Sequence, residues 1–584
     1  MRKYFEYINS ALTAMLFLMP LAGYNYILNI NEVHALLGAM VLTAAYVTLL
    51  LEKDIFISKR FLVYCGIFVL FIFILFLSGF VNGRLVLTIE YIFRCLFILL
   101  IVIYFYFFIQ IESYRFLFYV IAFSSIVFSA AGLIQLCGAE IPLMNYTSRP
   151  GSFLMDRTFA AEYVTLTLPF LIFNCLKSSK SKYLNLFFLL IPSAYLFSLR
   201  TRSAYISVLI FLIILFFTQK EKLKLIPIAI ILIAGISFSF INFPNFEKDR
   251  LNPLTSLVQY SKVRYEPNVS RLFFIDASIN LFAEKPLSGI GTGGWAGFFG
   301  KYHGDEISDR HINENSAINP HNEYLNFLSE NGIFGFLLFA ALIFIPLRFI
   351  KKDTPFFAAL TAFAFICLVS FPLENISLMM IASFSTAAAF QSGSLLNRKY
   401  IILSFLIFIS ICCAAYFLLR TGSEKKYITA MQYKSIGKYE EMNRELENIN
   451  TYLYPVDPNK MPVAFYKGAG YFQMKNFEKA YENFSEAADL MPYVPQILNN
   501  KAVALIALGK DEEAAKLLIE IKKYFPYYTE PQINLLSLYM KNRKYSEAEI
   551  LISELNFKND RHTRYACNYN NFLLLKKEFS ESKY

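Results

Sequence analysis

The sequence predicts an all-α protein that joins a polytopic membrane helix bundle of about thirteen transmembrane helices to a C-terminal α-solenoid of helical repeats. Of its 584 residues, 56% are hydrophobic and only 17% are charged, far from the composition of soluble domains. Apolar runs of about 20 residues, each long enough to cross a bilayer, recur as far as Arg420. Beyond Arg420 the composition is that of soluble helices, and residues recur at a spacing of 34.

The apolar runs place the membrane spans at residues 8–28, 33–51, 61–80, 88–110, 114–137, 158–177, 183–199, 203–218, 224–242, 332–350, 354–371, 373–391 and 399–420. The amino terminus lacks a small-residue cleavage site, so we expect the first helix to be retained. Of the eight cysteines, only Cys567 lies clearly outside the spans, which argues against a disulfide framework and against a cysteine zinc site.

The positive charges of the short loops predict how the chain is oriented. With the amino terminus in the cytoplasm, the cytoplasmic loops are 52–60, 111–114, 177–182, 219–224, 348–353 and 393–399, and five of these six carry clustered Lys or Arg. This bias accounts for much of the net charge of +11, so the charge does not indicate nucleic-acid binding. An odd number of spans places the C-terminal domain on the outer side.

Two longer segments then fall on the outer side, at residues 138–157 and 242–331. Arg200 and Arg202 fall there too, at the membrane edge, against the charge bias. Two interpretations stay open for these arginines. They could anchor lipid head groups, or they could bind an anionic group of a substrate at the membrane surface.

A polar motif with a histidine, residues 319–325, continues through Leu328, Glu330 and Gly332 into the apolar stretch from Ile333. Pro320 suits the first helical position and Asn319 the cap, which would put His321 in the first turn. There the free amide groups and the helix dipole favour an anion and disfavour a protonated imidazole. A neutral histidine beside a bound anion can act as a base on a phosphate-bearing substrate. The alternative is a structural cap or an interfacial histidine.

Two other patterns in the 242–331 segment indicate less. The glycines at 289, 291 and 294 match a dinucleotide fingerprint by letter, but no strand–helix–strand unit is predicted around them. Residues 303–311 begin and end with histidine and contain acidic residues, so they could be read as a metal site. A charged loop explains them better, and we expect neither a metal nor a cofactor.

The C-terminal segment repeats itself every 34 residues, as shown by Ala480, Ala514 and Ala548 and by Pro492 and Pro526. This period, with small residues where helices cross, resembles tetratricopeptide repeats, which are stacked helix pairs with a concave binding face. Three units are predicted, and residues 427–450 form a degenerate earlier one. Such repeats bind peptides or partner proteins more often than they catalyse reactions, so we expect a protein partner here.

The membrane part resembles the O-antigen ligase/polymerase superfamily over roughly residues 8–400. The motifs that carry the resemblance are Arg271-Leu272, Pro286-Leu287-Ser288-Gly289-Ile290-Gly291, His321-Asn322-Glu323-Tyr324-Leu325 with Glu330, Gly332 and Gly335, and Thr201-Arg202-Ser203-Ala204. Gly151-Ser152-Phe153, leading to Phe159 and Ala160, is similar to the Gly-Thr-Phe loop of that family. The Asn-Pro pair that follows this loop in the family is missing, and Met155-Asp156-Arg157 stand in the region instead.

The resemblance implies glycan transfer from an undecaprenyl pyrophosphate carrier to a lipid, glycan or protein hydroxyl at the periplasmic face of the bacterial inner membrane. Arg202 and Arg271 would grip the pyrophosphate without a metal, with Arg200 as a further candidate. His321 would take the proton of the acceptor hydroxyl in a single, inverting displacement. Asn322 and Glu330 would support the His321 helix.

The predicted domains are a membrane domain at 1–420, with a periplasmic catalytic loop at about 242–331, and a periplasmic repeat domain at 421–584. Polysaccharide ligation is the first hypothesis, with repeat-unit polymerisation and protein O-glycosylation as alternatives within the same superfamily. A transporter or a repeat-bearing scaffold is the non-enzymatic alternative. The spans are expected to be nearly free of ionisable groups, with Glu90 and Arg94 the main candidates, which favours surface chemistry over transport.

Overall fold

The computed structural model describes residues 2–23, 29–51, 55–111, 114–139, 151–177, 182–218, 222–241, 269–304, 318–390, 394–395 and 399–554. They fold into two compact units. The first, here the membrane unit, draws on Met1–Ile275, Phe282–Gly293 and Asn319–Lys425. The second, here the repeat unit, draws on Asp276–Leu281, Gly294–Ile318 and Lys426–Tyr584.

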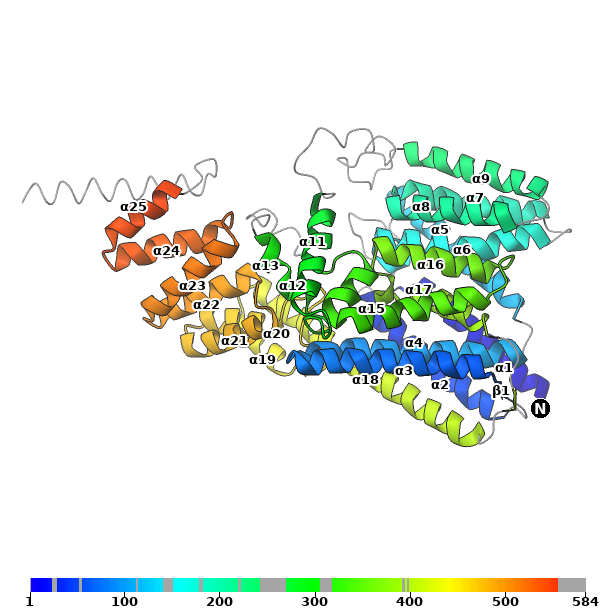
Figure 1. The fold of residues 1–584 in the computed structure, drawn as a ribbon, viewed down its shortest axis with the longest axis horizontal. Helices are drawn as coiled ribbons and strands as arrows, with labels where there is room; N and C mark the ends of the chain where they lie inside the picture. Colours follow the sequence, from blue (N-terminus) through cyan, green and yellow to red (C-terminus); the bar gives the residue numbers. More distant parts are fainter. Residues whose placement is uncertain are drawn as a thin grey trace, which may run out of the picture. The chain divides into compact units, whose positions relative to one another are not determined.

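The membrane unit is a bundle of long apolar helices, and Figure 1 shows many of them running side by side. Its helices are α1 (Arg2–Leu18), α2 (Ile30–Leu50), α3 (Lys59–Val81), α4 (Leu85–Ile111), α5 (Phe116–Leu136), α6 (Arg157–Lys177), α7 (Lys182–Ser198), α8 (Arg202–Thr218), α9 (Ile226–Ser237), α15 (Glu323–Phe349), α16 (Pro355–Val369), α17 (Ile376–Ala387) and the first part of α18 (Lys399–Ser435). Short 3-10 turns include η1 (Met19–Leu21), η2 (Ser152–Leu154), η3 (Lys222–Leu225), η4 (Phe238–Phe240) and η6 (Pro372–Glu374).

Each predicted span overlaps one of these helices, which confirms the all-α polytopic fold class. Within the described part of the chain, seven helices are long and apolar enough to cross a membrane, namely α2 to α6, α15 and α18. Four of the others, in α7, α8, α16 and α17, are apolar but shorter. Helix α1 ends ten residues before the predicted limit of its span because Pro20 follows in η1. Proline has no amide hydrogen and therefore cannot make the hydrogen bond that the interior of an α-helix requires.

Side-chain caps and burial explain how the helices are placed. Asn29, Ser58 and Asn375 each accept a hydrogen bond from a free backbone amide at the start of α2, α3 and α17. Helices α4 and α6 form the centre of the bundle. In the 18-residue apolar stretch of each helix, 72% of α4 and 89% of α6 is buried, against 33% of α3. A polar residue on α6 is therefore enclosed by protein and not by lipid.

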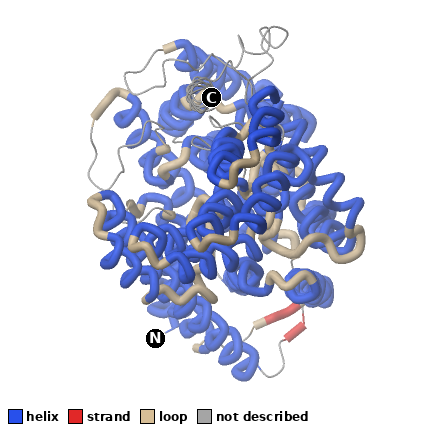
Figure 2. Tube along the Cα trace, turned by 90° about the vertical axis from the view of Figure 1, so that its left-hand side faces the viewer, coloured by secondary structure: helices blue, strands red, loops and turns tan. Residues whose placement is uncertain are grey.

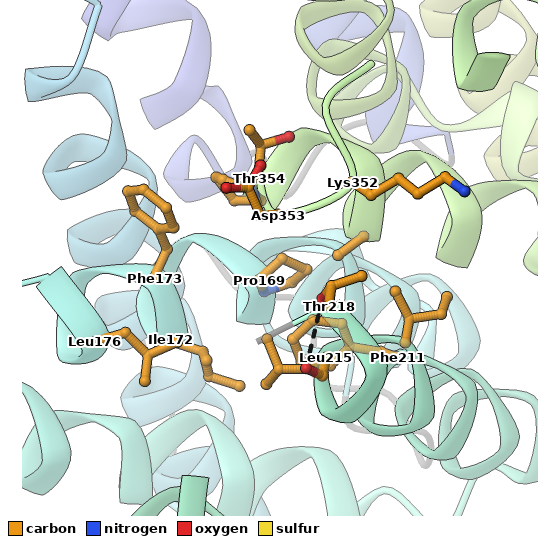
Figure 3. Close-up of a pocket in the computed structure, with 13 residues that line it drawn as sticks. Pro169, Ile172, Phe173, Leu176, Phe211, Leu215, Thr218, Lys352, Asp353 and Thr354 are labelled. Carbon is orange, nitrogen blue, oxygen red and sulfur yellow. Dashed lines mark hydrogen bonds between the residues drawn. The ribbon is translucent and has the colours of Figure 1, made fainter. Parts of the chain in front are cut away.

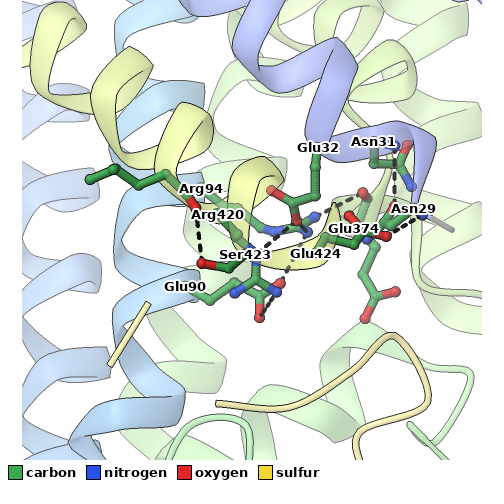
Figure 4. A network of polar contacts seen from close by, with 10 residues as sticks. Asn29, Asn31, Glu32, Glu90, Arg94, Glu374, Arg420, Ser423 and Glu424 are labelled. Carbon is green, nitrogen blue, oxygen red and sulfur yellow. Dashed lines mark hydrogen bonds and ion pairs between the residues drawn. The ribbon is translucent and has the colours of Figure 1, made fainter. Parts of the chain in front are cut away.

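A buried cluster of four charges joins α2, α4 and α18 (Figure 4). Arg94 lies 2.6 Å from Glu32 and 3.0 Å from Glu90, and Arg420 lies 3.0 Å from Glu32 and 2.9 Å from Glu90. Glu90 and Arg94 were predicted from the sequence and the other two charges were not, so the spans carry more charge than predicted. With two cations and two anions the cluster is balanced, which is how charges are tolerated away from water.

Two short features complete the membrane unit. Strands β1 (Phe56–Ile57) and β2 (Ser394–Leu395) pair antiparallel, with Phe56 opposite Leu395, and are the red segments in Figure 2. A recess lies between α6, α8 and the turn before α16, lined by apolar side chains together with Thr218, Lys352, Asp353 and Thr354 (Figure 3). It lies near the Lys177 end of α6, and none of the site residues predicted from sequence lines it.

The repeat unit is a row of helices in which each packs against the next. After the end of α18 come α19 (Tyr439–Glu447), α20 (Val463–Gln473), α21 (Phe477–Leu490), α22 (Pro495–Ala507), α23 (Asp511–Tyr524), α24 (Thr529–Lys541) and α25 (Tyr545–Glu554). Helices α21, α23 and α25 start 34 residues apart, and Ala480, Ala514 and Ala548 are fully buried at equivalent places in them. Assignment to the tetratricopeptide family stays a prediction.

Two very short helices, α12 (Trp295–Phe298) and α13 (Gly300–His303), also belong to the repeat unit, as does the middle of α11 (Val269–Glu284). The two ends of α11 belong to the membrane unit. The described part of the predicted catalytic loop is therefore divided, because residues 276–281 and 294–304 group with the repeats and residues 282–293 do not.

Candidate active site

His321 lies in a tight turn just before α15, and its backbone has a φ of 51°. The Asn319 side chain accepts a hydrogen bond from the His321 amide at 3.1 Å. The helix itself starts at Glu323, where the Asn322 side chain accepts from the Leu325 amide at 3.0 Å. The predicted cap was therefore wrong. Asn322 is the cap, Asn319 closes the preceding turn, and the left-handed backbone keeps His321 out of the first helical turn.

Two aromatic rings hold the imidazole of His321. The Phe274 ring stacks on it with centroids 5.9 Å apart, and the Phe371 ring meets it edge-on at 5.0 Å. Burial, as the larger cause, and the positive charge of Arg271 together lower the pKa of His321 to about 4, against the opposing effect of Asp156. The imidazole is therefore neutral at pH 7, for reasons that differ from the helix dipole invoked from the sequence.

Arg271 lies in the first turn of α11 and is exposed. Its charge acts on His321 and also on the carboxyl group of Glu162. Of the three arginines predicted to bind a pyrophosphate, it is the one whose charge acts on the histidine within the described part of the chain. A guanidinium that is both exposed and next to a neutral base can meet an anionic group arriving from outside.

Arg200 and Arg202 lie at the junction of α7 and α8. Arg200 has a φ of 52°, and its Nη2 donates to the Ile241 carbonyl at 3.1 Å. Arg202 is the first residue of α8, but its side chain lies outside the described residues. The role predicted for this pair in binding pyrophosphate remains a prediction.

A compact turn leads into α6 and brings Asp156 into the site. Gly151 packs so closely on the backbone of Asp156 that an added Cβ would lie 2.4 Å from its nitrogen. Asp156 caps α6 by accepting from the amides of Thr158 at 2.7 Å and Phe159 at 3.1 Å. This is the region where the sequence departs from the family pattern. Asp156 supplies the cap there, and its charge acts on His321.

Glu162, on the second turn of α6, is a site residue that the sequence analysis missed. It is 0% exposed, and neither carboxyl oxygen has a hydrogen-bond partner within the part of the chain that the structure describes. Ser370, which interacts with Glu162, likewise leaves its buried Oγ without a hydrogen bond among the described residues. Burying a carboxyl group in a span without a hydrogen bond costs free energy. The signal available in the sequence was a single acid within an apolar run.

Two residues between α16 and η6, Ser370 and Phe371, lie between Glu162 and His321. Ser370 lies beside Glu162, and the next residue, Phe371, packs against both His321 and Phe159, the latter with ring centroids 5.3 Å apart. Three separated parts of the chain therefore meet here, since α6, the α16–η6 junction and the turn before α15 contribute one side each. The sequence gives no spacing from which this meeting could be predicted.

The glycine-rich turn at residues 286–291 packs into a kink in α15. Gly332 interrupts that helix with φ 66° and ψ −166°, and a Cβ at this position would lie 2.4 Å from the Leu287 carbonyl oxygen. The Ile333 amide donates to the Pro286 carbonyl at 2.9 Å. Gly289, with φ 64°, approaches the carbonyl of Glu330 just as closely. These glycines are required because the two backbones touch.

Glu330 links the same turn to α15. Its Oε2 accepts from the Gly293 amide at 2.9 Å, and its carbonyl accepts from the Gly291 amide at 3.0 Å. Ser78 on α3 donates to that carbonyl at 2.7 Å. Burial lowers the pKa of Arg84 to about 10, and the nearby charge of Glu330 opposes that change. Glu330 thus holds the glycine turn against α15, and Asn322 caps the same helix.

The histidines of the alternative metal site lie elsewhere. His303 is in the repeat unit, where its Nε2 is 3.0 Å from Asp276 Oδ2. His311 lies outside the described residues. Among the residues that are described, no group of three or more metal-ligating side chains comes together.

Comparison with known proteins identifies one family. Residues 187–340 match the family model described as O-antigen ligase. The matched segment includes Arg200, Arg202, Arg271, His321 and Glu330 and ends in α15. A search of curated proteins finds no significant match.

Proposed function

We propose that this membrane protein, whose residues 187–340 match the family model described as O-antigen ligase, transfers a glycan from a polyprenyl pyrophosphate carrier to an acceptor hydroxyl. The family supports glycosyl transfer of the ligase or polymerase type. The observation that carries the finer proposal is the arrangement around His321. A neutral imidazole lies between two rings and next to an exposed arginine whose charge acts on it.

In this reaction the bond between the anomeric carbon and the pyrophosphate oxygen breaks, and its electron pair goes to the pyrophosphate. The acceptor oxygen forms the new bond to that carbon and gives its proton to His321. Arg271 neutralises the charge that develops on the leaving group, with Arg202 and Arg200 as further candidates. A single displacement inverts the carbon without a covalent enzyme intermediate.

The low pKa of His321 is compatible with a basic role. In the free protein, burial and Arg271 together keep the ring neutral. When a pyrophosphate binds Arg271, its negative charge offsets that of the guanidinium and raises the proton affinity of the imidazole. The base therefore becomes stronger when the donor is in place.

Asn322 and Glu330 support the position of His321. Asn322 caps α15, and Glu330 connects the glycine-rich turn to the same helix, so the turn that carries His321 leads into a well-anchored helix. We propose a multi-pass location in the bacterial inner membrane, with the amino terminus in the cytoplasm and the reaction at the periplasmic face, supported by the positive charge of the predicted cytoplasmic loops. Ligation of a polysaccharide to a lipid or glycan acceptor is the leading assignment.

Deleting the gene and profiling the surface glycans tests this assignment. Accumulated lipid-linked polymer indicates a ligase, accumulated single repeat units indicate a polymerase, and an unglycosylated protein indicates a protein O-oligosaccharyltransferase. In parallel, the purified protein in liposomes should convert a polyprenyl pyrophosphate-linked glycan and release the free carrier pyrophosphate. Unchanged glycans in the deletion strain, together with no release in liposomes, would refute the proposal.

A further inference from the structure

The repeat unit contains a piece of the loop that carries the candidate active site. Residues 295–304, here the docking segment, form α12 and α13, and Phe299 between them keeps helical angles of φ −51° and ψ −45°. Helix α13 packs against α23 of the repeats (Figure 1). The repeats therefore hold a segment of their own chain.

Three glycines allow the docking segment to approach the repeats at backbone distance. A Cβ at Gly297 would lie 2.9 Å from Met491 Sδ, one at Gly300 would lie 2.4 Å from the Tyr493 carbonyl oxygen, and one at Gly304 would lie 2.0 Å from the Tyr524 carbonyl oxygen. None of the three has a positive φ. Glycine is needed at these positions for closeness and not for backbone conformation.

The segment follows the period of the repeats. Gly297 meets the end of α21 at Met491, and Gly304 meets the end of α23 next to Phe525, both of which are 0% exposed. Met491 and Phe525 are equivalent positions in successive repeats, 34 residues apart. The two glycines are therefore spaced to meet equivalent turns of neighbouring repeats.

Specific polar and aromatic contacts accompany this fit. The Tyr493 amide donates to the Gly297 carbonyl at 2.9 Å, and the Tyr493 ring packs on Phe298 with centroids 5.6 Å apart. Phe298 and Tyr493 are both partly buried. A backbone hydrogen bond between the loop and the turn after α21 fixes the register of the docking segment.

The opposite side of the docking segment holds α11. Trp295 Nε1 donates to Ser278 Oγ at 2.9 Å, and both residues are almost completely buried. His303 Nε2 lies 3.0 Å from Asp276 Oδ2. Arg271 is seven residues before Ser278 on the same helix, which is about two turns away. Holding Asp276 and Ser278 thus sets the direction in which α11 presents Arg271.

We propose that the C-terminal repeats bind the docking segment as an intramolecular ligand and, through it, position α11 and Arg271 for the transfer reaction. The binding part stands on the contacts within the repeat unit alone, and the positioning part rests on the proposed function. The repeats act in this way as part of the enzyme, in addition to any external partner.

Trp295 is the single tryptophan of the chain, so its fluorescence reports directly on the docking segment. In the full-length protein we expect Gly304→Val to expose the indole, shift its emission to longer wavelength and make it quenchable by iodide. Transfer should fall at least tenfold. The matched control is Gly422→Val, where an added Cβ meets nothing within 4 Å, and there both signals should stay as in the parent.

A milder variant separates positioning from unfolding. Ser278→Ala removes the hydrogen bond from Trp295 without adding bulk, and circular dichroism should show its helices intact. With Arg271 displaced, the pKa of His321 should rise, so the acid limb of kcat/KM should move to higher pH in both variants, which loss of stability alone does not produce.

Unchanged Trp295 fluorescence in Gly304→Val would overturn the docking. Exposed Trp295 with unchanged transfer and pH profile would overturn the positioning. A parent that releases no carrier pyrophosphate would count against the proposed function, while the fluorescence would still test the docking.

Discussion

Phe274 and His321 face each other with ring centroids 5.9 Å apart and planes 21° from parallel. Phe274 lies three residues after Arg271 on α11, so the ring that covers the imidazole and the cation that acts on it lie on the same side of one helix. Movement of α11 must therefore change both the burial of His321 and the charge next to it. The reactivity of the histidine is in this way coupled to the position of a single helix.

Replacing His321 by Asn should reduce transfer by about 100-fold or more, because general base catalysis contributes roughly 10²–10⁴ in rate. Asn is preferred to Ala because it tolerates the left-handed backbone found at this position. Transfer is measured in liposomes, and insertion is checked by yield and thermal unfolding. His562→Asn, at a histidine that has no proposed role in the reaction, serves as the control. Full activity of His321→Asn would remove the histidine from the mechanism.

The acid limb of kcat/KM should lie near pH 4 and not near the 6.5 of an ordinary histidine, because the pKa of His321 is lowered to about 4 in the free protein. Below that pH the ring is protonated and cannot accept a proton, so the rate falls as the pH falls. Arg271→Gln removes a positive charge that lowers this pKa, so the limb should move to higher pH. Asp156→Asn removes the opposing negative charge and should move it the other way. Profiles that do not move in these two variants would separate both residues from His321.

Chelation should leave transfer unchanged, because arginines are proposed to neutralise the leaving pyrophosphate. Initial rates with and without EDTA provide the measurement, with Arg271→Gln as the comparison that should lose activity. Strong inhibition by EDTA that is reversed by a divalent cation would favour a metal at the pyrophosphate.

The helices of the membrane unit could be predicted because hydropathy over about 20 residues is a local property. The contact between the Pro286–Gly291 turn and Gly332 could not be predicted, although both motifs are evident in the sequence. Close approach of two backbones is a property of the folded chain and not of a local sequence. The cap of α15 was misplaced because Asn319 and Asn322 both suit the position, and only the left-handed backbone of His321 decides between them.

Glu162 shows a further limit of sequence reasoning. Its neighbours Arg271 and Ser370 lie more than one hundred residues further along the chain, so no spacing reveals the contact. Arg420 was missed for the same reason. It contacts Glu32 and Glu90 in the folded protein, but it is far from both of them in the sequence. Residues that combine in such clusters are visible only after the helices have packed.

Gly332→Ala should destabilise the membrane unit, because a Cβ at this position would lie 2.4 Å from the Leu287 carbonyl and the backbone conformation is one that only glycine adopts easily. Backbone strain of this kind costs about 1–3 kcal/mol before the clash is counted. Thermal unfolding in detergent measures the change. Gly66→Ala is the matched control, since nothing lies within 4 Å of an added Cβ there. Equal stability of the two variants would show that the kink at Gly332 is not needed.

Glu162→Leu should raise stability and lower transfer together. The carboxyl is fully buried without a hydrogen-bond partner in the described part of the protein, and replacing such a group by an apolar one of similar size removes a penalty of about 1–3 kcal/mol. A group retained at that cost, on which the charge of Arg271 acts, is expected to serve the reaction. Thermal unfolding and transfer are measured on the same preparations, with Glu162→Gln as the variant that keeps the shape and the polarity. A Leu variant that is more stable and fully active would show that the buried acid has no part in the reaction.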